Sequence, residues 1–184
     1  ELEEKWLHLS LKLIADIGII GKPNAGKSTL LSKLTNASPK VADYPFTTLR
    51  PILGVAKKFD NEIVLADIPG LIEGAYKGKG LGHNFLAHIE RCKILLHLID
   101  CTSLDYENNY NTIKNELKKY GKQLSNKQEI IALSKIDLKT NGINKIKEKL
   151  LKITGKKPIM ISSFSQEGLE ELLETLFKIC FKND

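Results

Sequence analysis

The chain has 184 residues, of which 42% are hydrophobic and 27% are charged, and its formal net charge is +6. These proportions are ordinary for one globular domain, and a chain of this length can bury about 70% of its unfolded surface without disulfides or structural metals. Three scattered cysteines argue against a disulfide framework or a zinc site, and no apolar run approaches the ~20 residues of a membrane span.

The first functional motif in the chain is GKPNAGKS, at residues 21–28. An apolar run at 13–20 predicts a strand before it, and the segment 27–36 is expected to be helical. A strand, a glycine-bounded loop and a helix predict a phosphate-binding loop, because the loop amides and the positive end of the helix dipole point to one place. Lys27 would supply a positive charge to the β- and γ-phosphates, and Ser28 a hydroxyl to Mg²⁺.

The loop at residues 37–50 contains Tyr44-Pro45-Phe46-Thr47-Thr48, which offers two hydroxyls. A threonine bound to Mg²⁺ would let this loop sense the γ-phosphate, since its backbone N–H can bond that phosphate only while it is present. In isolation the motif would indicate an ordinary turn, but after a phosphate loop a switch is the favoured interpretation.

A β-hairpin is predicted next, with antiparallel strands at 51–59 and 63–66. Asp67, at the end of the second strand, would hold a water on Mg²⁺. The N–H of Gly70 could approach the γ-phosphate closely because glycine has no side chain. Four glycines within 71–83 predict a second, mobile switch.

The rest of the chain alternates between predicted helices and strands. Helices are expected at 83–91, 106–121, 144–153 and from 168 onward, and strands at 94–100, 129–133 and 158–161. This order predicts an α/β fold with a mostly parallel sheet and helices on both faces, and ligands bind at the carboxyl ends of such strands. His97, inside a buried strand, is interpreted as a core histidine rather than a ligand.

The motif SKID, at residues 134–137, indicates the base. The carboxylate of Asp137 can accept both the N1–H and the 2-amino group of guanine, whereas adenine offers neither donor there. Lys135 could lay its aliphatic stem over the base plane, and the backbone N–H of Ser163 could donate to guanine O6.

Residues 111–160 hold thirteen lysines and four acidic residues, a local charge of +9. A basic face of this kind can attract RNA phosphates. The scarcity of aromatic residues that would stack on bases favours the alternative, an ordinary solvated surface.

The order GKPNAGKS, Thr48, DIPG, SKID and SSF resembles the five-motif GTPase domain. The stretches ADYPFTTLRPILG and DIPGLIEGAYKGKGLGHNFLAHIERC resemble, more narrowly, the Obg (CgtA) GTPases, from about residue 9 to residue 181. The resemblance implies a Ras-like fold with six strands, Mg²⁺-dependent hydrolysis of GTP to GDP and phosphate, and a role in large ribosomal subunit assembly and the stringent response. It also implies a cytoplasmic monomer with rRNA and ribosomal proteins as partners and ppGpp as a further candidate ligand.

The motifs and the resemblance together assign roles to individual residues. The catalytic group would be Asn24, Lys27, Thr48, Asp67 and Gly70. Mg²⁺ would be held by Ser28 and Thr48, with Asp67 acting through water. The nucleotide-binding residues would be Gly21, Lys22, Pro23, Asn24, Ala25, Gly26, Lys27, Ser28, Thr29, Phe46, Thr47, Thr48, Asp67, Gly70, Ser134, Lys135, Asp137, Leu138, Ser162, Ser163 and Phe164.

The chain departs from the family pattern at three places. Ser134 replaces the asparagine of the usual NKxD and loses an amide that would brace guanine and the phosphate loop, so a lower affinity is expected. Ser163 replaces the usual alanine, a minor change because its expected contact comes from the backbone. The family's glycine-rich N-terminal domain is missing, so residues 1–12 are interpreted as a strand or linker remnant and 13–184 as the GTPase domain.

Leu71 stands where Ras-type GTPases carry a water-orienting glutamine, so slow intrinsic hydrolysis is expected. Resemblance to related GTPases with the same replacement suggests that Asn24 helps to hold K⁺, which would neutralise charge as an arginine finger does elsewhere. Asn24 has a second interpretation as a residue tolerated in a tight turn. Two other function classes stay open: a guanine-nucleotide-sensing module with negligible turnover, and a P-loop phosphotransferase, for which no acceptor-binding insertion is visible.

Overall fold

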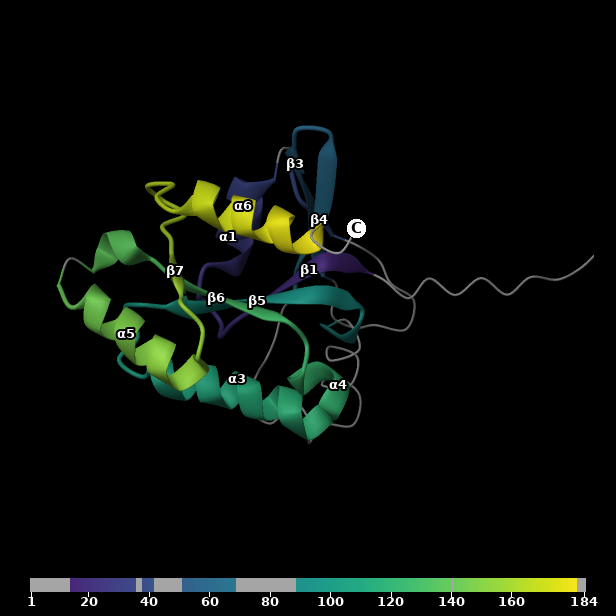
Figure 1. Ribbon diagram of the computed structural model, residues 1–184. Coiled ribbons are helices and arrows are strands. Elements are labelled where there is room, and N and C mark those ends of the chain that lie inside the picture. Colours follow the sequence, from purple (N-terminus) through teal and green to yellow (C-terminus); the bar gives the residue numbers. More distant parts are fainter. Residues whose placement is uncertain (1–13, 36–37, 42–50, 69–88, 140, 182–184) are drawn as a thin grey trace, which may run out of the picture.

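The computed structural model of the chain describes residues 14–35, 38–41, 51–68, 89–139 and 141–181. They form a seven-stranded sheet in the order β2-β3-β4-β1-β5-β6-β7, with helices on both faces (Figure 1). The strands are β1 (Ala15–Ile20), β2 (Lys40–Val41), β3 (Ile52–Lys58), β4 (Asn61–Asp67), β5 (Cys92–Asp100), β6 (Glu129–Ser134) and β7 (Ile159–Met160). The helices are α1 (Lys27–Leu34), α3 (Tyr106–Tyr120), α4 (Lys122–Ser125), α5 (Ile143–Thr154) and α6 (Leu169–Cys180), with a 3₁₀ turn at Ile136–Leu138. None of the helices in this described part has the length and hydropathy that crossing a membrane requires.

The strand order places the site residues at one edge of the sheet. β1 pairs in parallel with both β4 and β5, and parallel pairing continues from β5 to β6 and β7. β3 runs antiparallel to β4 after the turn at Phe59 and Asp60, and the short β2 runs antiparallel to β3. The carboxyl ends of β1, β4, β5 and β6 therefore meet at the same edge, where open α/β sheets bind their ligands.

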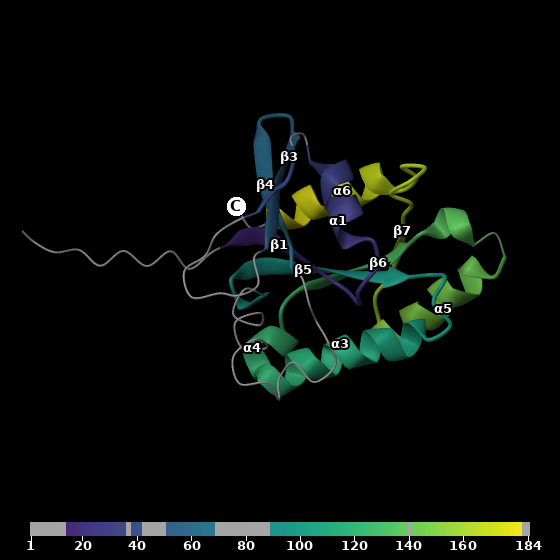
Figure 2. The same ribbon diagram turned by 180° about the vertical axis from the view of Figure 1, so that it is seen from behind.

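Two helical layers cover the sheet and bury its near-continuous apolar strands. α1 and α6 lie on one face, and α3, α4 and α5 lie on the other, as both views show (Figures 1 and 2). Ile17 and Ile19 of β1 belong to the core cluster under α1 and α6, whereas Ile20 belongs to the cluster under α3 and α4. On α6, the buried side chains recur every three or four residues, which is the spacing of one helix face; they are Leu169, Leu172, Leu176 and Phe177.

The predicted α/β class, the mostly parallel sheet, the hairpin and the two-sided helical cover agree with this architecture. The sheet has a seventh strand beyond the expected six, because two residues of the predicted loop at 37–50 pair with β3 as β2. The four-residue α4 was not predicted, since one turn of helix is too short to show a periodicity. The strand or linker remnant expected at 1–12 and most of the helix expected at 83–91 lie outside the described residues.

Candidate nucleotide-binding site

The phosphate loop joins β1 to α1 at the carboxyl edge of the sheet. A side chain at Gly21 would meet the carbonyl oxygen of Leu98 at 2.6 Å, so a glycine lets the loop pack directly against β5. Gly26, the N-cap of α1, has a φ of 97°, which side chains rarely tolerate. Asn24 is exposed, and its backbone is in the left-handed region with a φ of 63°, a conformation that asparagine adopts more readily than most residues. The loop therefore brings the free amides at the start of α1 to its own concave side.

Lys27 is folded back over this loop. Its Nζ lies 3.3 Å from the carbonyl oxygens of both Gly21 and Lys22. Burial lowers the pKa of Lys27, and the nearby Asp67 carboxylate opposes that shift. An ammonium group partly removed from water, beside the unpaired amides of a helix N-terminus, forms an anion-binding site.

Ser28 and Asp67 meet beside the phosphate loop although 39 residues separate them in the sequence. β4 places Asp67 opposite Ile19 of β1, and the Ser28 hydroxyl donates to Oδ2 of the carboxylate. Asp67 is 4% exposed, and its Oδ1 has no hydrogen-bond partner among the described residues.

This pair fits the Mg²⁺ expected from the motifs. A hydroxyl and a carboxylate are the oxygen ligands that Mg²⁺ accepts, and Mg²⁺ commonly uses only one or two protein groups beside waters and phosphates. The described residues hold no cluster of three or more His, Cys, Asp or Glu side chains suited to a metal.

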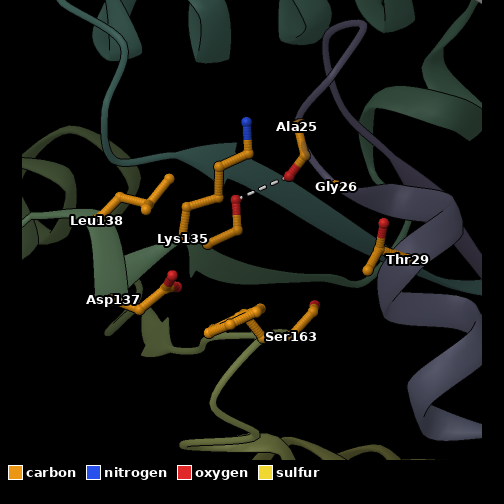
Figure 3. A pocket seen from close by; sticks show the side chains of 9 residues that line it. Ala25, Gly26, Thr29, Lys135, Asp137, Leu138 and Ser163 are labelled. Carbon is orange, nitrogen blue, oxygen red and sulfur yellow. Dashed lines mark hydrogen bonds between the residues drawn. The ribbon is translucent and has the colours of Figure 1, made fainter.

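A pocket of about 310 Å³ opens beside the start of α1 (Figure 3). All nine of its lining residues are among those predicted to bind the nucleotide; they are Ala25, Gly26, Thr29, Ser134, Lys135, Asp137, Leu138, Ser163 and Phe164. They come from the phosphate loop with α1, from the loop after β6, and from the loop after β7. The fold thus unites three distant segments around one cavity of the size of a small ligand.

Ser162 holds two parts of this pocket in place, the carboxylate of Asp137 and the loop after β7. Its fully buried hydroxyl donates to Oδ1 of Asp137 at 2.6 Å and accepts the backbone N–H groups of Phe164 and Ser165 at 3.2 and 3.0 Å. The Asp137 side chain is thereby held in one orientation with Oδ2 left for a ligand.

Asp100 is a site residue that sequence reasoning missed. Its Oδ2 accepts a hydrogen bond from Nζ of Lys135 at 2.6 Å, and its Oδ1 accepts from the N–H and hydroxyl of Thr102. Burial alone would raise the pKa of Asp100, but the bonds from Lys135 and Thr102 outweigh it and lower that pKa. The salt bridge fixes the end of the Lys135 side chain, whose stem lines the pocket.

Ser134 corrects one expectation. Its loss of an amide was expected to remove a brace from the phosphate loop, but the buried Ser134 hydroxyl lies 2.9 Å from the carbonyl oxygen of Ala25 (dashed line in Figure 3). A serine is long enough to reach the loop because β6 ends directly beside it. The connection between the two loops is therefore present in this chain.

Several predicted positions lie outside the described residues. They are Phe46, Thr47, Thr48, Gly70, Leu71 and the glycine-rich segment 71–83. The roles of both switches, including the Mg²⁺ contact of Thr48 and the phosphate contact of Gly70, stay predictions.

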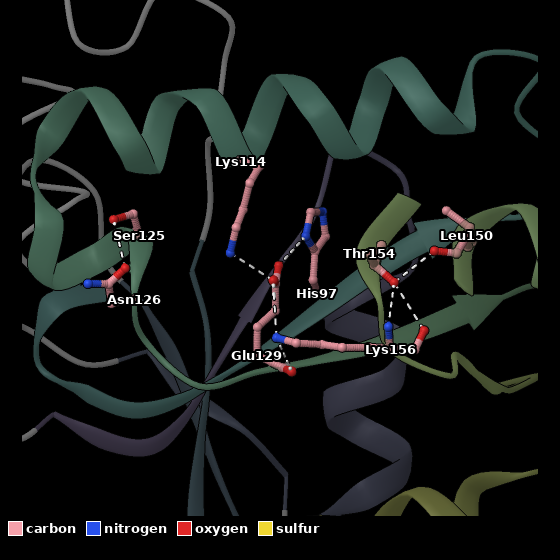
Figure 4. A network of polar contacts seen from close by, with 8 residues as sticks. All are labelled: His97, Lys114, Ser125, Asn126, Glu129, Leu150, Thr154 and Lys156. Carbon is pink, nitrogen blue, oxygen red and sulfur yellow. Dashed lines mark hydrogen bonds and ion pairs between the residues drawn. The ribbon is translucent and has the colours of Figure 1, made fainter. Parts of the chain in front are cut away.

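A second polar cluster lies at the other end of β6, and we call its members His97, Lys114, Glu129 and Lys156 the Glu129 network (Figure 4). Oε1 of Glu129 lies 2.9 Å from Nδ1 of His97, and Oε2 lies 2.9 Å from Nζ of Lys114. Lys156 donates to the Glu129 carbonyl at 2.9 Å, and the His97 ring stacks on Tyr110 with centroids 5.2 Å apart. The interpretation of His97 as a core histidine is confirmed by its 1% exposure and its paired ring.

The parallel sheet, the glycine-bounded loop with its lysine and the pocket at the strand ends define a P-loop nucleotide-binding domain. More narrowly, the chain belongs to the family of 50S ribosome-binding GTPases, whose family model matches residues 16–135. It is 54% identical over 173 residues to the GTPase Obg of Rickettsia massiliae (strain Mtu5), covering 94% of this chain and 52% of that protein. It is 53% identical over 179 residues to the GTPase Obg of Rickettsia felis, covering 96% of this chain and 54% of that protein. These matches confirm the resemblance to the Obg GTPases, and the chain spans about half the length of these curated relatives.

Solved structures support the same fold. The G domain of the T. maritima FeoB iron transporter matches with a TM-score of 0.69 and 25% identity, over 88% of this chain and 96% of that one. The cytosolic domain of the same transporter in a GDP form matches with a TM-score of 0.70 and 25% identity, over 91% of this chain and 63% of that one. The predicted Ras-like fold is confirmed, with β2 as its additional short strand.

Proposed function

We propose that this chain binds GTP with Mg²⁺ and hydrolyses it slowly to GDP and phosphate, as the nucleotide switch of a longer protein. The observation that carries the proposal is the pocket in which Asp137, held by Ser162, faces the phosphate-loop residues Ala25 and Gly26. A carboxylate with a free oxygen selects the N1–H and 2-amino group of guanine, and a purine placed there would direct its phosphates toward Lys27.

The chain's own groups would position the nucleotide. Lys27 would exchange its weak bonds to the Gly21 and Lys22 carbonyls for the β- and γ-phosphates, and the amides after Gly26 would bond the phosphate oxygens. Mg²⁺, when bound by Ser28 and, through water, by Asp67, would neutralise charge on the β- and γ-phosphates. Thr48 and Gly70 would complete the γ-phosphate site from the two switches.

Slow turnover is part of the proposal because Leu71 cannot orient the attacking water. Asn24, exposed at the outer turn of the phosphate loop, is the residue that we assign to K⁺. The second candidate function, a guanine-nucleotide sensor with negligible turnover, is favoured by the same leucine. Single-turnover hydrolysis in potassium and in sodium buffer, with and without ribosomes, separates these possibilities, and equal rates in both cations would remove the K⁺ assignment.

The cellular role proposed for the whole protein is that of a switch in large ribosomal subunit assembly and in the stringent response. It rests on the 50S ribosome-binding GTPase family and on the similarity to proteins named GTPase Obg. The lysine-rich surface of α5 and of the segment after it would attract phosphates of rRNA, although Lys149 and Lys156 also pair with Glu107 and Glu129. In the same proposal, ppGpp would compete with GTP for the pocket. A cytoplasmic location and a monomeric state belong to the same proposal.

Competition against a fluorescent GDP, with Mg²⁺ present, tests the nucleotide assignment. We expect displacement by GTP and ppGpp but not by ATP. Asp137→Asn should weaken GDP binding by about a hundredfold or more, because the amide presents a donor to guanine's donors, while its oxygen still accepts the Ser162 bond. Equal displacement by ATP would refute guanine recognition and reopen the phosphotransferase class.

A further inference from the structure

The hydroxyl of Ser134 connects the base loop to the phosphate loop from inside the protein. Ser134 is 3% exposed, and its Oγ lies 2.9 Å from the carbonyl oxygen of Ala25 and 3.1 Å from that of Ile99. A hydroxyl has one hydrogen, so these two carbonyls share the only donor that Ser134 has. Turning this hydrogen toward a ligand would forfeit its bonds to buried carbonyls, which are costly to leave unpaired.

This commitment limits what Ser134 can offer a purine, although it lines the pocket. With the Watson–Crick edge of guanine on Asp137, the remaining edge of the base carries the acceptors O6 and N7. A serine oxygen whose hydrogen is already engaged presents only lone pairs, and an acceptor cannot bond another acceptor. The neighbouring ammonium of Lys135 is held by Asp100, with Nζ 2.6 Å from Oδ2.

We propose that Ser134 is a positioning residue of the phosphate loop and makes no bond to the base. It holds Ala25, which directly precedes the N-cap Gly26 of α1, and thereby sets where the loop amides and Lys27 meet the phosphates. The usual asparagine at this position would serve base and loop together, whereas this chain keeps the loop function alone. The inference rests on the proposed function, because it concerns how the same site divides its contacts between base and phosphates.

The test compares ligands with and without phosphates. In Ser134→Ala, the affinity for GDP should fall about three- to tenfold, which is the value of one hydrogen bond, while the affinity for guanosine should change less than about twofold. The ratio of GDP to 7-deaza-GDP affinities should stay the same, because the lost hydroxyl does not touch N7. A general loss of packing would instead weaken GDP and guanosine alike.

Ser32→Ala is the matched control. Ser32 also donates to a backbone carbonyl at 2.9 Å, that of Thr29, but from the exposed side of α1. We expect no change in the affinity for GDP, 7-deaza-GDP or guanosine in this variant.

Besides an equal weakening of GDP and guanosine binding, two outcomes would overturn the inference. One is a change of more than about threefold in the GDP to 7-deaza-GDP ratio on Ser134→Ala. The other outcome needs no variant at position 134. Ser163→Ala removes the other serine hydroxyl of the pocket. If this variant still binds GDP more than about fivefold more tightly than 7-deaza-GDP, Ser134 is left as the side chain that donates to N7. Either result with intact GDP binding refutes only this inference, whereas a native chain that binds no GDP refutes the proposed function as well.

Discussion

Two buried carboxylates differ in how many partners the protein gives them. One is Asp67, beside the phosphate loop, and the other is Glu129, in the network at the opposite end of the sheet. Asp67 receives the Ser28 hydroxyl on one oxygen, and its other oxygen has no partner among the described residues. Glu129 has His97 on one oxygen and Lys114 on the other, and the carbonyl of the same residue accepts from Lys156. Within the described residues, Glu129 thus has partners for both of its carboxylate oxygens, whereas Asp67 has a partner for one.

We interpret this difference as one between a carboxylate that the proposed function reserves for a ligand and a carboxylate that stabilises the fold. A buried polar atom without a partner lowers stability, so an unpaired oxygen in a native protein calls for an explanation. An unpaired oxygen does not by itself indicate a ligand site, because Oε2 of Glu116 on α3 also lacks a partner within the described part of the chain. Asp67 is distinguished by the Ser28 hydroxyl and the Lys27 ammonium beside it, which suit the Mg²⁺ and phosphate of the proposed function.

The largest expected effect is that of Glu129→Ala on folding. Removing the carboxylate leaves His97 and Lys114 without their buried partner, which should lower the free energy of unfolding by about 3–5 kcal/mol. Urea unfolding measures it. Glu174→Ala removes an exposed glutamate that pairs with Lys58 at 2.7 Å and should cost at most about 1 kcal/mol. The GDP affinity of the folded Glu129→Ala protein should be unchanged. A large loss of affinity would show that the Glu129 network also supports the nucleotide site.

The second prediction is a pH dependence carried by the same carboxylate. Burial alone would raise the pKa of Glu129, but the hydrogen bond and charge of His97 and those of Lys114 lower it from 4.5 to about 2. Because the folded pKa is depressed, its stabilisation is complete above the unfolded pKa and is lost as the pH falls from 4.5 toward 2. The whole contribution is about 3 kcal/mol, and roughly 2 kcal/mol of it should disappear between about pH 7 and pH 3.

The measurement is the difference in unfolding free energy between the native chain and Glu129→Ala at both pH values. That difference cancels the titrating groups that do not contact Glu129, and it should shrink at the lower pH. A difference that stays constant would show that the Glu129 charge is not what stabilises the network.

Asp67→Asn is expected to have the opposite sign and a smaller size. It removes a buried charge that the described residues only half pair, so the nucleotide-free chain should be as stable as before or more stable by about 1 kcal/mol. Mg²⁺-dependent GTP binding should weaken in the same variant. Asp60→Asn, in the exposed hairpin turn, is the control for both measurements. A loss of stability like that of Glu129→Ala would place Asp67 among the groups that serve the fold.

The sequence predicts the parts of the site that belong to a short local motif. Asp137, Lys135 and Ser163 each follow a predicted strand, and in a parallel sheet the ends of these strands lie at one edge, so the sequence alone predicts that the three residues line one pocket. The helix and strand limits were predictable for the same reason, since each element of more than one or two turns shows its own hydrophobic period.

The parts that were missed depend on which strands are neighbours. Asp100 becomes a partner of Lys135 only because β5 and β6 pair in a register that sets it opposite Ser134, and a lone aspartate at a strand end gives no local signal for that. The Ser134 bond to Ala25 spans 109 residues and depends on side-chain direction, which residue type does not reveal. The two-residue β2 exists through its pairing with β3, not through its own propensity.

The smallest expected effect tests that missed residue. Asp100→Asn keeps an oxygen for the Thr102 bonds but removes the charge that holds Lys135, so the lysine stem should lie less firmly along the base pocket. Both partners are partly exposed, at 18% and 31%, and solvent screening limits the effect to about 1 kcal/mol, or roughly a fivefold loss of GDP affinity. This loss of GDP affinity should be smaller in high salt, because salt already weakens the Asp100–Lys135 ion pair of the native chain. Asp105→Asn, an exposed carboxylate five residues further along the chain with no capping bond from its side chain, should leave the affinity unchanged at every salt concentration. An Asp100→Asn protein with native affinity at low salt would show that the lysine stem is held by packing alone, and that the charges at this edge of the pocket, unlike those around Asp67, are dispensable for binding.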